Sequence, residues 1–518
     1  MFVKKKRNRS GTTSIVVAEK SNQNYKEHIT IGISSDESEI KQFVEKGEQW
    51  IRAYKRKLAP ELDLFGEGKD AQYKEKELVL QLLNNVENIL LNGTELILGR
   101  VFNKIGFNQI GDEIFRKLVQ ARLSYPCSKS ATVEYLKNHF DEDVNLTMLY
   151  RYLDKLNHSQ QDKIQDISVS HTQQVLGGQI GVMFYDVTTL YFETDKEDEL
   201  RKTGFSKEGR HSNPQIILGL LVSIDGYPLA YCIDEGNKYE GHTMLPVVKE
   251  FVNKYQLSDF IVVADSGLMT EQNLFEMEEN GYQYIIGARI KNESDQVKQW
   301  ILSQSKIDRQ IVELDKGRGR RLVVGYTEER AKKDAYNRQK GVKRVEKLYK
   351  RGLLTKEHIN KRGYNKFLKI ENKIAISINY DKIDQDAQWD GLKGYLTNTE
   401  LPIEQVYSAY HNLWNVERAF RISKSKIEIR PIFHFTRKRI EAHICICFVA
   451  LKVYKELERI IKQTHINMSV DKVLNMAKTI TTIQIKMPIN NQILSKTMIM
   501  KRHKRIEILF DEMFWGTH

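Results

Sequence analysis

The 518-residue sequence lacks any apolar run of the roughly 18–20 residues that a membrane-spanning helix needs. Its first ten residues, MFVKKKRNRS, are basic, but no apolar segment of the signal-peptide type follows them. These absences argue against a membrane span and a secretory signal. We therefore expect a cytoplasmic protein with no membrane partner.

Cysteine is scarce, with only four in the chain. Cys445 and Cys447 lie two residues apart within HICICFVALKVY, a pattern typical of a buried helix rather than of a metal-binding knuckle. Cys127 and Cys232 have no Cys or His neighbour at ligand spacing. We expect all four to be packing residues in a chain that stays in the cytoplasm.

The charge that is present is concentrated in one segment. The chain is 41% hydrophobic and 29% charged, as in soluble globular proteins, and its length predicts three or four domains. Its formal net charge is +13, yet Lys316–Lys369 alone carries 19 Lys or Arg against 5 Asp or Glu. This local excess favours polyanion binding. The alternative is a solvated pair of charged helices.

Changes in the hydrophobic pattern and in composition along the chain predict four regions. The apolar spacing is helical before Gly178, and from there strand-like runs alternate with helices, which predicts an α/β fold with a mixed sheet. The predicted regions are a basic and polar arm with its lead-in (1–74), a helical domain (75–175), an α/β domain (176–440) with a basic insertion (about 290–395), and a C-terminal helical region (441–518).

Within the helical domain, SKSATVEYLKNHF and NLTMLYRYLDKL read as two short helices around a polar turn. This arrangement suits a helix-turn-helix module of the kind that binds DNA. In that case Tyr150 and Arg151 would be more exposed than Leu149 and Leu153. The alternative is a purely structural helical domain that packs on the α/β domain.

Two aspartates follow apolar runs in the α/β domain. Asp186 and Asp265 are each expected at the end of a strand, where side chains emerge into a cleft from rigid backbone. Buried carboxylates without partners are costly, and a metal ion removes that cost. Each aspartate alone is equally compatible with a cap of the next turn.

A third carboxylate lies on a predicted long helix from about Ile403 to Ser425. Seven steps of ~100° return nearly to the starting direction, so Tyr410, Glu417 and Lys424 share one face. Trp414 and Arg421 lie on the same side. An aromatic, a carboxylate and cations on one stripe suit a surface that faces a metal and a phosphate backbone. The alternative is a solvated, charged helix.

These segments together resemble an insertion-sequence transposase with a DDE catalytic domain, in the superfamily with a Tyr-x2-Arg-x3-Glu-x6-Lys signature. The signature corresponds to Tyr410, Glu417 and Lys424, with Leu413 where Arg is expected. The resemblance covers roughly residues 95–455. Its other matching segments are YDVTTLYFET, GFSKEGR, DGYPLAY, Gly236-Asn237, VVADSGLMT and YTEERAKKDAYNR.

The resemblance implies a ribonuclease-H-like fold with an insertion before the glutamate helix, in which Asp186, Asp265 and Glu417 ligate two Mg²⁺ or Mn²⁺ ions. Tyr410 and Lys424 would contact DNA phosphates. We add Trp414 and Arg421 from the same helix face as further DNA contacts. From the basic insertion we add a second set: Arg330, Lys332, Lys333 and Arg338.

The implied function is the cleavage and transfer of DNA strands at the ends of an insertion sequence. The partners would be the terminal inverted repeats and target DNA, and the active nucleoprotein complex would contain a dimer at the nucleoid. Leu413 puts one phosphate contact in doubt, and Arg418 or Arg421 would replace it. The alternatives are a non-catalytic, DNA-binding derivative of a transposase and another ribonuclease-H-like nuclease.

Overall fold

The computed structural model describes the chain except for residues 22–23, 59–68, 157, 208, 269, 354–362, 372–374, 488–490 and 516–518. Its contacts define two compact units. The smaller comprises Met1–Val86 and Ile485–Ile493, and the larger comprises Glu87–Gln484 and Leu494–His518. Among the described residues, no helix combines the length and the apolar character that a bilayer span requires.

The smaller unit contains an antiparallel sheet in the order β1-β2-β3, where a loose arm was expected. The arm prediction was wrong because the apolar run Ile15–Ala18, which is buried, is only four residues long and is flanked by polar and charged residues. The elements are β1 (Phe2–Arg7), β2 (Thr13–Ser21), β3 (Asn24–Ser34), α1 (Glu37–Leu58) and α2 (Lys69–Asn84).

The larger unit begins with a helical region. Ser128 and Asn145 cap two of its helices by accepting hydrogen bonds from the backbone N–H groups of Ala131 and Met148. Leu149 and Leu153 are fully buried, as their spacing predicts. The elements are β4 (Val86–Leu90), α3 (Gly93–Ile105), α4 (Glu113–Ser124), α5 (Lys129–Phe140), α6 (Leu146–Lys155) and α7 (His158–Leu176).

A mixed sheet of eight strands, in the order β10-β11-β14-β9-β8-β5-β6-β7, forms the centre of the larger unit. Strands β8 and β9 run parallel to β5, whereas β6 and β7 are antiparallel neighbours joined by a tight turn at Asp225-Gly226. The core strands are β5 (Val182–Tyr191), β6 (Gln215–Ser223), β7 (Pro228–Glu235), β8 (Ile261–Ala264) and β9 (Gln283–Ala288).

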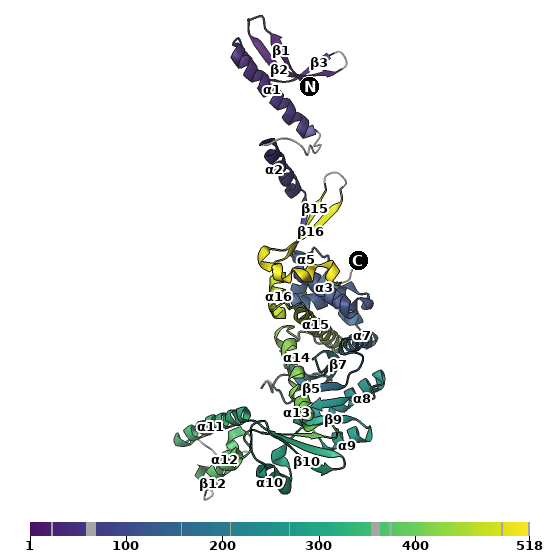
Figure 1. Cartoon of the computed structure of the whole chain (residues 1–518), viewed down its shortest axis with the longest axis vertical. Helices are drawn as coiled ribbons and strands as arrows, with labels where there is room; N and C mark the ends of the chain where they lie inside the picture. Colours follow the sequence, from purple (N-terminus) through teal and green to yellow (C-terminus); the bar gives the residue numbers. More distant parts are fainter. Residues whose placement is uncertain are drawn as a thin grey trace. The chain divides into compact units, whose positions relative to one another are not determined.

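Both faces of this sheet are covered, as Figure 1 shows. Phe184 and Leu190 of β5 belong to the apolar cluster that includes α14 and α15, whereas Met183 and Tyr185 belong to the cluster that includes α8 (Met244–Tyr255) and α9 (Glu271–Glu279). Side chains of one strand therefore alternate between two cores. This layered architecture confirms the expected α/β fold with a mixed sheet.

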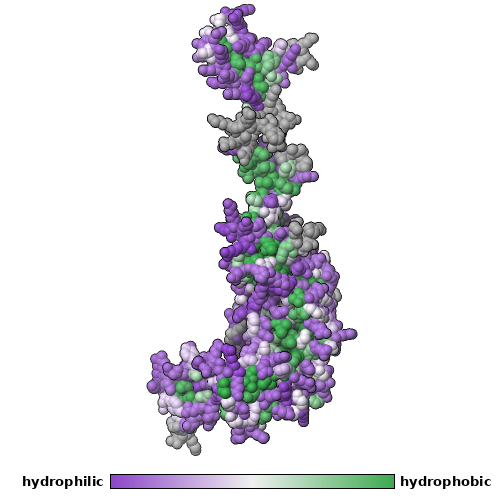
Figure 2. Space-filling model, viewed as in Figure 1, coloured by the Kyte–Doolittle hydropathy of each residue, from purple (hydrophilic) through white to green (hydrophobic). Residues whose placement is uncertain are grey.

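The basic insertion is built onto the sheet, since β14 pairs with β9 and β11 pairs with β14. The sheet continues from β11 to β10, and α10 packs against β11 and β14. Hydrophilic residues cover most of the visible surface of the insertion (Figure 2). Its elements are α10 (Asp295–Ser303), β10 (Ile311–Gly317), β11 (Arg320–Tyr326), α11 (Glu328–Lys350), β12 (Leu368–Glu371), β13 (Ala375–Ile378), α12 (Tyr380–Ala387) and β14 (Leu392–Thr397).

The C-terminal part is dominated by α15, which continues across the predicted boundary at residue 440. Cys445 and Cys447 are buried in it, as expected. The predicted helical region also contains two strands, because TTIQIK alternates β-branched and polar residues. The elements are α13 (Ile403–His411), α14 (Trp414–Ser425), α15 (Arg437–Gln463), α16 (Val470–Ala477), β15 (Thr481–Lys486), β16 (Ile493–Met498) and α17 (Glu512–Trp515).

Candidate active site

Two neighbouring parallel strands bring Asp186 and Asp265 together. Tyr185 of β5 pairs with Ala264 of β8, so the following residues, Asp186 and Asp265, occupy equivalent positions on adjacent strands. Asp265 directly follows β8, as predicted. Asp186 lies inside β5 instead of at its end, because β5 continues to Tyr191 through its antiparallel pairing with β6.

The Asp186 carboxylate is surrounded by charge. Its pKa is raised to about 6, chiefly by burial. The Lys207 ammonium and the backbone N–H of Val187 lower this pKa, and the carboxylates of Asp265 and Glu240 raise it. The Lys207 Nζ lies 3.8 Å from Asp186 Oδ1 and 3.4 Å from Glu240 Oε1. It also donates a hydrogen bond of 2.8 Å to the carbonyl oxygen of Val187. One ammonium group therefore offsets the charge of two carboxylates.

Tyr410, on α13, reaches the second aspartate. Its hydroxyl donates a hydrogen bond of 3.1 Å to Asp265 Oδ1, and its ring lies 4.6 Å from that of Tyr395. Burial raises the pKa of Tyr410, so the hydroxyl keeps its proton. The approach depends on Gly287 of β9, because a Cβ atom there would lie 2.6 Å from the Tyr410 hydroxyl oxygen.

The predicted single helix over residues 403–425 is two helices, α13 and α14, joined through Asn412 and Leu413. At the junction, Leu413 N–H bonds the carbonyl oxygen of Tyr410 at 3.0 Å, and Asn415 N–H bonds that of Asn412 at 2.9 Å. These i→i−3 bonds tighten the turn. Leu413 is buried in the apolar core, which gives the residue at the expected Arg position a packing role.

Glu417, on α14, belongs to the same electrostatic neighbourhood as Asp265. The Glu417 carboxylate raises the pKa of Tyr410, after burial and Asp265. Burial lowers the pKa of Lys393 on β14, whereas Asp265 and Glu417 both raise it. Glu417 itself is exposed to solvent. Glu417 thus shares two neighbours, Tyr410 and Lys393, with Asp265.

Lys424, on α14, contacts β5 close to Asp186. Its Nζ donates a hydrogen bond of 2.6 Å to Thr188 Oγ1, two residues beyond Asp186 on β5. Burial lowers its pKa, as does Lys207, whereas Asp186 raises it. Lys424 and Lys207 therefore place two cations around one carboxylate, which is a suitable setting for a phosphate group.

The other predicted contacts on α14 are exposed. Trp414 is 48% exposed, and Arg421 is also exposed, three and four residues from Glu417 on the same face. Arg418 is not available as a replacement for the signature Arg, because its guanidinium forms an ion pair with Glu458 on α15. Of the two arginines considered, only Arg421 has an exposed position from which to replace it.

The predicted contacts in the insertion divide into two groups. Arg330 lowers the pKa of Lys393, whose pKa Asp265 and Glu417 raise, so Arg330 lies near these carboxylates. Lys332 and Lys333 are exposed on α11. Arg338 is different, because its guanidinium forms a two-pronged ion pair with Asp390 and its side chain is only 14% exposed. Arg338 therefore stabilises the insertion, and the prediction that it contacts DNA does not fit its position.

Sequence reasoning missed two groups at the centre of the site, Lys207 and Glu240. Lys207 lies within GFSKEGR, and Glu240 follows Gly236-Asn237 by three residues, so both segments were noticed as motifs without a role for these side chains. Only the fold shows that Lys207 contacts Asp186 and Glu240, and that both groups change the pKa of Asp186.

The oxygen-rich donor set suits a hard divalent cation such as Mg²⁺ or Mn²⁺. The raised pKa of Asp186 supports this fit, because burial disfavours its ionised form and a bound cation would stabilise that form. In the described part of the chain, no three His, Cys, Asp or Glu side chains are already arranged to hold a metal ion. Instead, Lys207 contacts Asp186 and the Tyr410 hydroxyl contacts Asp265.

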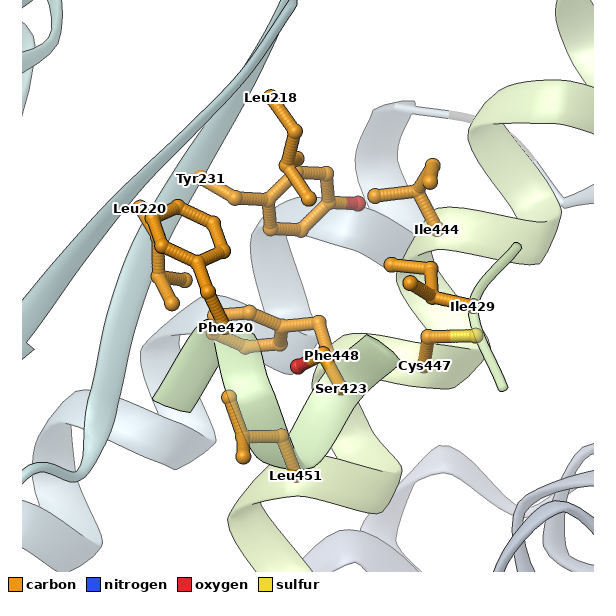
Figure 3. A pocket seen from close by; sticks show the side chains of 10 residues that line it. All are labelled: Leu218, Leu220, Tyr231, Phe420, Ser423, Ile429, Ile444, Cys447, Phe448 and Leu451. Atoms are coloured by element: carbon orange, nitrogen blue, oxygen red, sulfur yellow. The ribbon is translucent and has the colours of Figure 1, made fainter. Parts of the chain in front are cut away.

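An apolar cavity lies behind α14, between β6, β7 and α15, and Figure 3 shows its lining. None of the three carboxylates lines it, so it is separate from the active site. It is lined by Leu218, Leu220, Tyr231, Phe420, Ser423, Ile429, Ile444, Cys447, Phe448 and Leu451.

Comparison with solved structures gives transposases at low similarity. The piggyBac transposase synaptic complex with hairpin DNA is 8% identical, with a TM-score of 0.39 and coverage of 77% of this chain and 79% of that chain. The Mos1 mariner paired-end complex with Mn is 12% identical, with a TM-score of 0.14 and coverage of 30% and 54%. The Mos1 paired-end complex with the left transposon end is 11% identical, with a TM-score of 0.16 and coverage of 46% and 66%.

These superpositions are too partial to assign the family, and no curated protein matches the chain. The sequence family described as the transposase DDE domain matches residues 177–452, more than half of the chain. This range begins before β5 and ends within α15, so it includes all three carboxylates. The chain therefore belongs to the transposase DDE domain family.

Proposed function

We propose that the chain binds the ends of an insertion sequence and catalyses metal-dependent DNA cleavage and strand transfer. The observation that carries the proposal is the placement of Asp186 in β5 beside Asp265 after the parallel strand β8, with Glu417 of α14 in electrostatic range of Tyr410, which hydrogen-bonds to Asp265. Cationic side chains surround them, as binding of a phosphodiester requires.

Asp186, Asp265 and Glu417 would hold two Mg²⁺ or Mn²⁺ ions. When bound, the ions supply charge stabilisation for the attacking and leaving oxygens of the phosphodiester. The protein's own part is positional: the Tyr410 hydroxyl orients Asp265, and the strand backbone fixes Asp186. Lys424 and Lys207 lie where they can contact a phosphate oxygen.

Cleavage by water would free a 3′-hydroxyl at the element's end. That hydroxyl would then attack target DNA, or the opposite strand to form a hairpin. Both routes place an oxygen nucleophile and a phosphate between the same carboxylates. Exposed Trp414, beside Glu417, is positioned to stack on a base displaced from the duplex. The active complex would contain a dimer of the chain on two DNA ends.

Two other functions share parts of this site. A non-catalytic derivative would bind DNA without cutting it, but a derivative of that kind has no need for three ionisable carboxylates at the end of one sheet. Another ribonuclease-H-like nuclease would share the carboxylates. The basic insertion, with Lys332 and Lys333 exposed on α11, favours a protein that also holds a long DNA segment.

The test is cleavage of a duplex that carries the DNA flanking the gene, with Mg²⁺, with Mn²⁺ and with chelator. We expect cuts at the element's end only when metal is present, and strand transfer into a second duplex. Binding without cleavage under all conditions would identify the non-catalytic derivative. Cleavage of unrelated DNA or RNA with equal rate would identify a general nuclease.

A further inference from the structure

In the part of the smaller unit that the structure describes, α1 packs against one face of the sheet. Val3 of β1 and Gly32 of β3 face α1, because a Cβ atom at Gly47 would meet Val3 and one at Gly32 would meet Phe43. Successive side chains of a strand point to opposite faces. Lys4 and its neighbours in alternate positions therefore lie on the face opposite α1.

This second face, here called the open face, exposes large apolar side chains. Phe2 is 39% exposed, Tyr25 is 50% exposed and Ile33 is 58% exposed. The rings of Phe2 and Tyr25 meet edge to face at 5.8 Å, and the Lys4 ammonium lies 4.5 Å from the centre of the Tyr25 ring. Exposed apolar side chains that gather on one face are typical of a binding surface.

The open face is also basic. Lys4 and Lys6 on β1 share it with Lys20 on β2, as the strand register shows. Among the described residues of the three strands, one acidic side chain lies on the open face. It is Glu27, whose Oε1 lies 3.4 Å from Lys6 Nζ. Across residues 1–34 there are seven Lys or Arg against two Glu. The complementary ligand is therefore a polyanion.

The size of the sheet suits duplex DNA. Neighbouring strands lie about 4.8 Å apart, so the outer two of three strands are separated by roughly 10 Å. The DNA major groove is about 12 Å wide and admits β-strands as well as helices. Lysines along the edge strand would reach phosphates, and Tyr25 and Phe2 would meet base edges or thymine methyl groups.

A row of lysines on an edge strand has another use, because it discourages pairing with a second chain. That use explains Lys5 and Lys6 on β1. It does not explain why Phe2 and Tyr25 are ordered and exposed on the broad face, with Lys4 placed over the Tyr25 ring. The combination of aromatic and cationic side chains on one face matches a nucleic-acid surface.

We propose that the open face of the β1-β2-β3 sheet binds duplex DNA and contributes to recognition of the element's ends. This inference rests on the proposed function for the identity of the DNA. It places recognition outside the α5–α6 pair. On α6, Tyr150 is half-buried beside His434, and Asp154 forms an ion pair with Arg439 on α15, so part of α6 serves packing.

The test uses the full chain with Lys4→Gln, Lys6→Gln and Lys20→Gln combined, which removes the charge and keeps a polar side chain. The matched control replaces three exposed cations of α1 in the same unit, Lys41→Gln, Lys46→Gln and Arg52→Gln. The probes are a duplex with the terminal repeat and a scrambled duplex, titrated from 50 to 200 mM salt. Tyr25→Ala tests the aromatic contact separately.

We expect the open-face variant to bind both duplexes about 100-fold more weakly at 0.1 M salt, with a log–log salt slope shallower by about 2.7 for three lost phosphate contacts. The control should stay within threefold of wild type. Tyr25→Ala should reduce the preference for the terminal repeat by about tenfold. Urea midpoints close to wild type would show that the variants are folded.

Equal weakening in the variant and the control would show a general charge effect and overturn the proposal. Wild-type binding by the variant would overturn it too, and loss of dimers in that case would assign the face to contacts between copies. Metal-dependent cleavage by the wild-type chain is measured in the same samples. If the wild-type chain neither binds nor cuts the repeat, the proposed function fails, which is a different outcome.

Discussion

The Tyr410 hydroxyl donates a hydrogen bond of 3.1 Å to Asp265 Oδ1, across 145 residues of sequence. The bond connects α13, which follows the basic insertion, to the end of β8 in the central sheet. It therefore gives Tyr410 a direct structural role as a group that orients a carboxylate. Tyr410 is buried, whereas Asp265 is exposed to solvent and can take further ligands.

Tyr410→Phe keeps the ring and removes this hydrogen bond. Because Asp265 then loses an orienting partner, we expect cleavage to fall by roughly 10–100-fold, and the free energy of unfolding to fall by about 1 kcal/mol. Manganese affinity, measured by calorimetry, should fall as well. Tyr407→Phe on the same helix is the control, and an equal loss there would remove the specific role of Tyr410.

Asp186→Asn, Asp265→Asn and Glu417→Gln should each abolish cleavage and leave DNA binding within threefold of wild type. Each change keeps the shape and removes one charge from a unit that works together. The measurements are product formation and gel-shift affinity on the same duplex. Cleavage within tenfold of wild type in any variant would remove that residue from the catalytic set.

The raised pKa of Asp186 predicts a pH-dependent stability. The group titrates at about 6 in the folded chain and at 3.8 without the fold, so the folded state holds the proton more tightly between these values. Raising the pH through this window lowers the free energy of unfolding by up to ~3 kcal/mol. Asp186→Asn should therefore stabilise the metal-free chain more at pH 8 than at pH 4.

Urea denaturation in chelator at both pH values measures this difference. Asp195→Asn, at an exposed carboxylate, is the matched control and should leave the pH dependence unchanged. A gain in stability that is the same at pH 4 and pH 8 would contradict the environment assigned to Asp186. Manganese affinity should also weaken as the pH falls below about 6, since the proton and the metal compete for one carboxylate.

Much of the sheet was predictable because its strands are short, apolar and separated by clear turns. The hairpin at Asp225-Gly226 and the strand before Asp265 follow from local pattern alone. The placement of Asp186 inside β5 does not follow from local pattern, because pairing with β6 extends the strand past Asp186. The three strands of the smaller unit also depend on pairing with one another. The charged residues that flank their short apolar run gave no strand pattern from which this pairing could be predicted.

The carboxylates were identifiable by their positions relative to predicted elements, but their neighbours were not. Lys207 and Glu240 act on Asp186 through contacts that only the folded chain creates. The division of the helix at Leu413 likewise depends on burial in the core, since the sequence period continues through it. The ion pair of Arg338 could not be predicted, because its partner, Asp390, lies 52 residues away in the sequence.

Lys207→Met should separate metal binding from catalysis. The Lys207 ammonium lies within 4 Å of both Asp186 and Glu240, where it opposes a divalent cation electrostatically. Removing it should raise manganese affinity about tenfold and reduce cleavage, because a phosphate contact is lost as well. Lys202→Met, in the same loop, is the control. Unchanged manganese affinity would show that Lys207 does not oppose the metal.

The last prediction contrasts two cations of α11. Arg338→Ala removes the partner of Asp390 and should lower the free energy of unfolding by about 2–3 kcal/mol, with DNA affinity per folded molecule unchanged. Lys333→Ala should leave stability unchanged, because the side chain is exposed, and should make the log–log salt slope of DNA binding shallower by about 0.9. Urea titration and salt-dependent binding measure the two effects. Asp390→Ala should repeat the Arg338→Ala result, since both remove the same ion pair, whereas a change of salt slope in Arg338→Ala would restore Arg338 as a DNA contact.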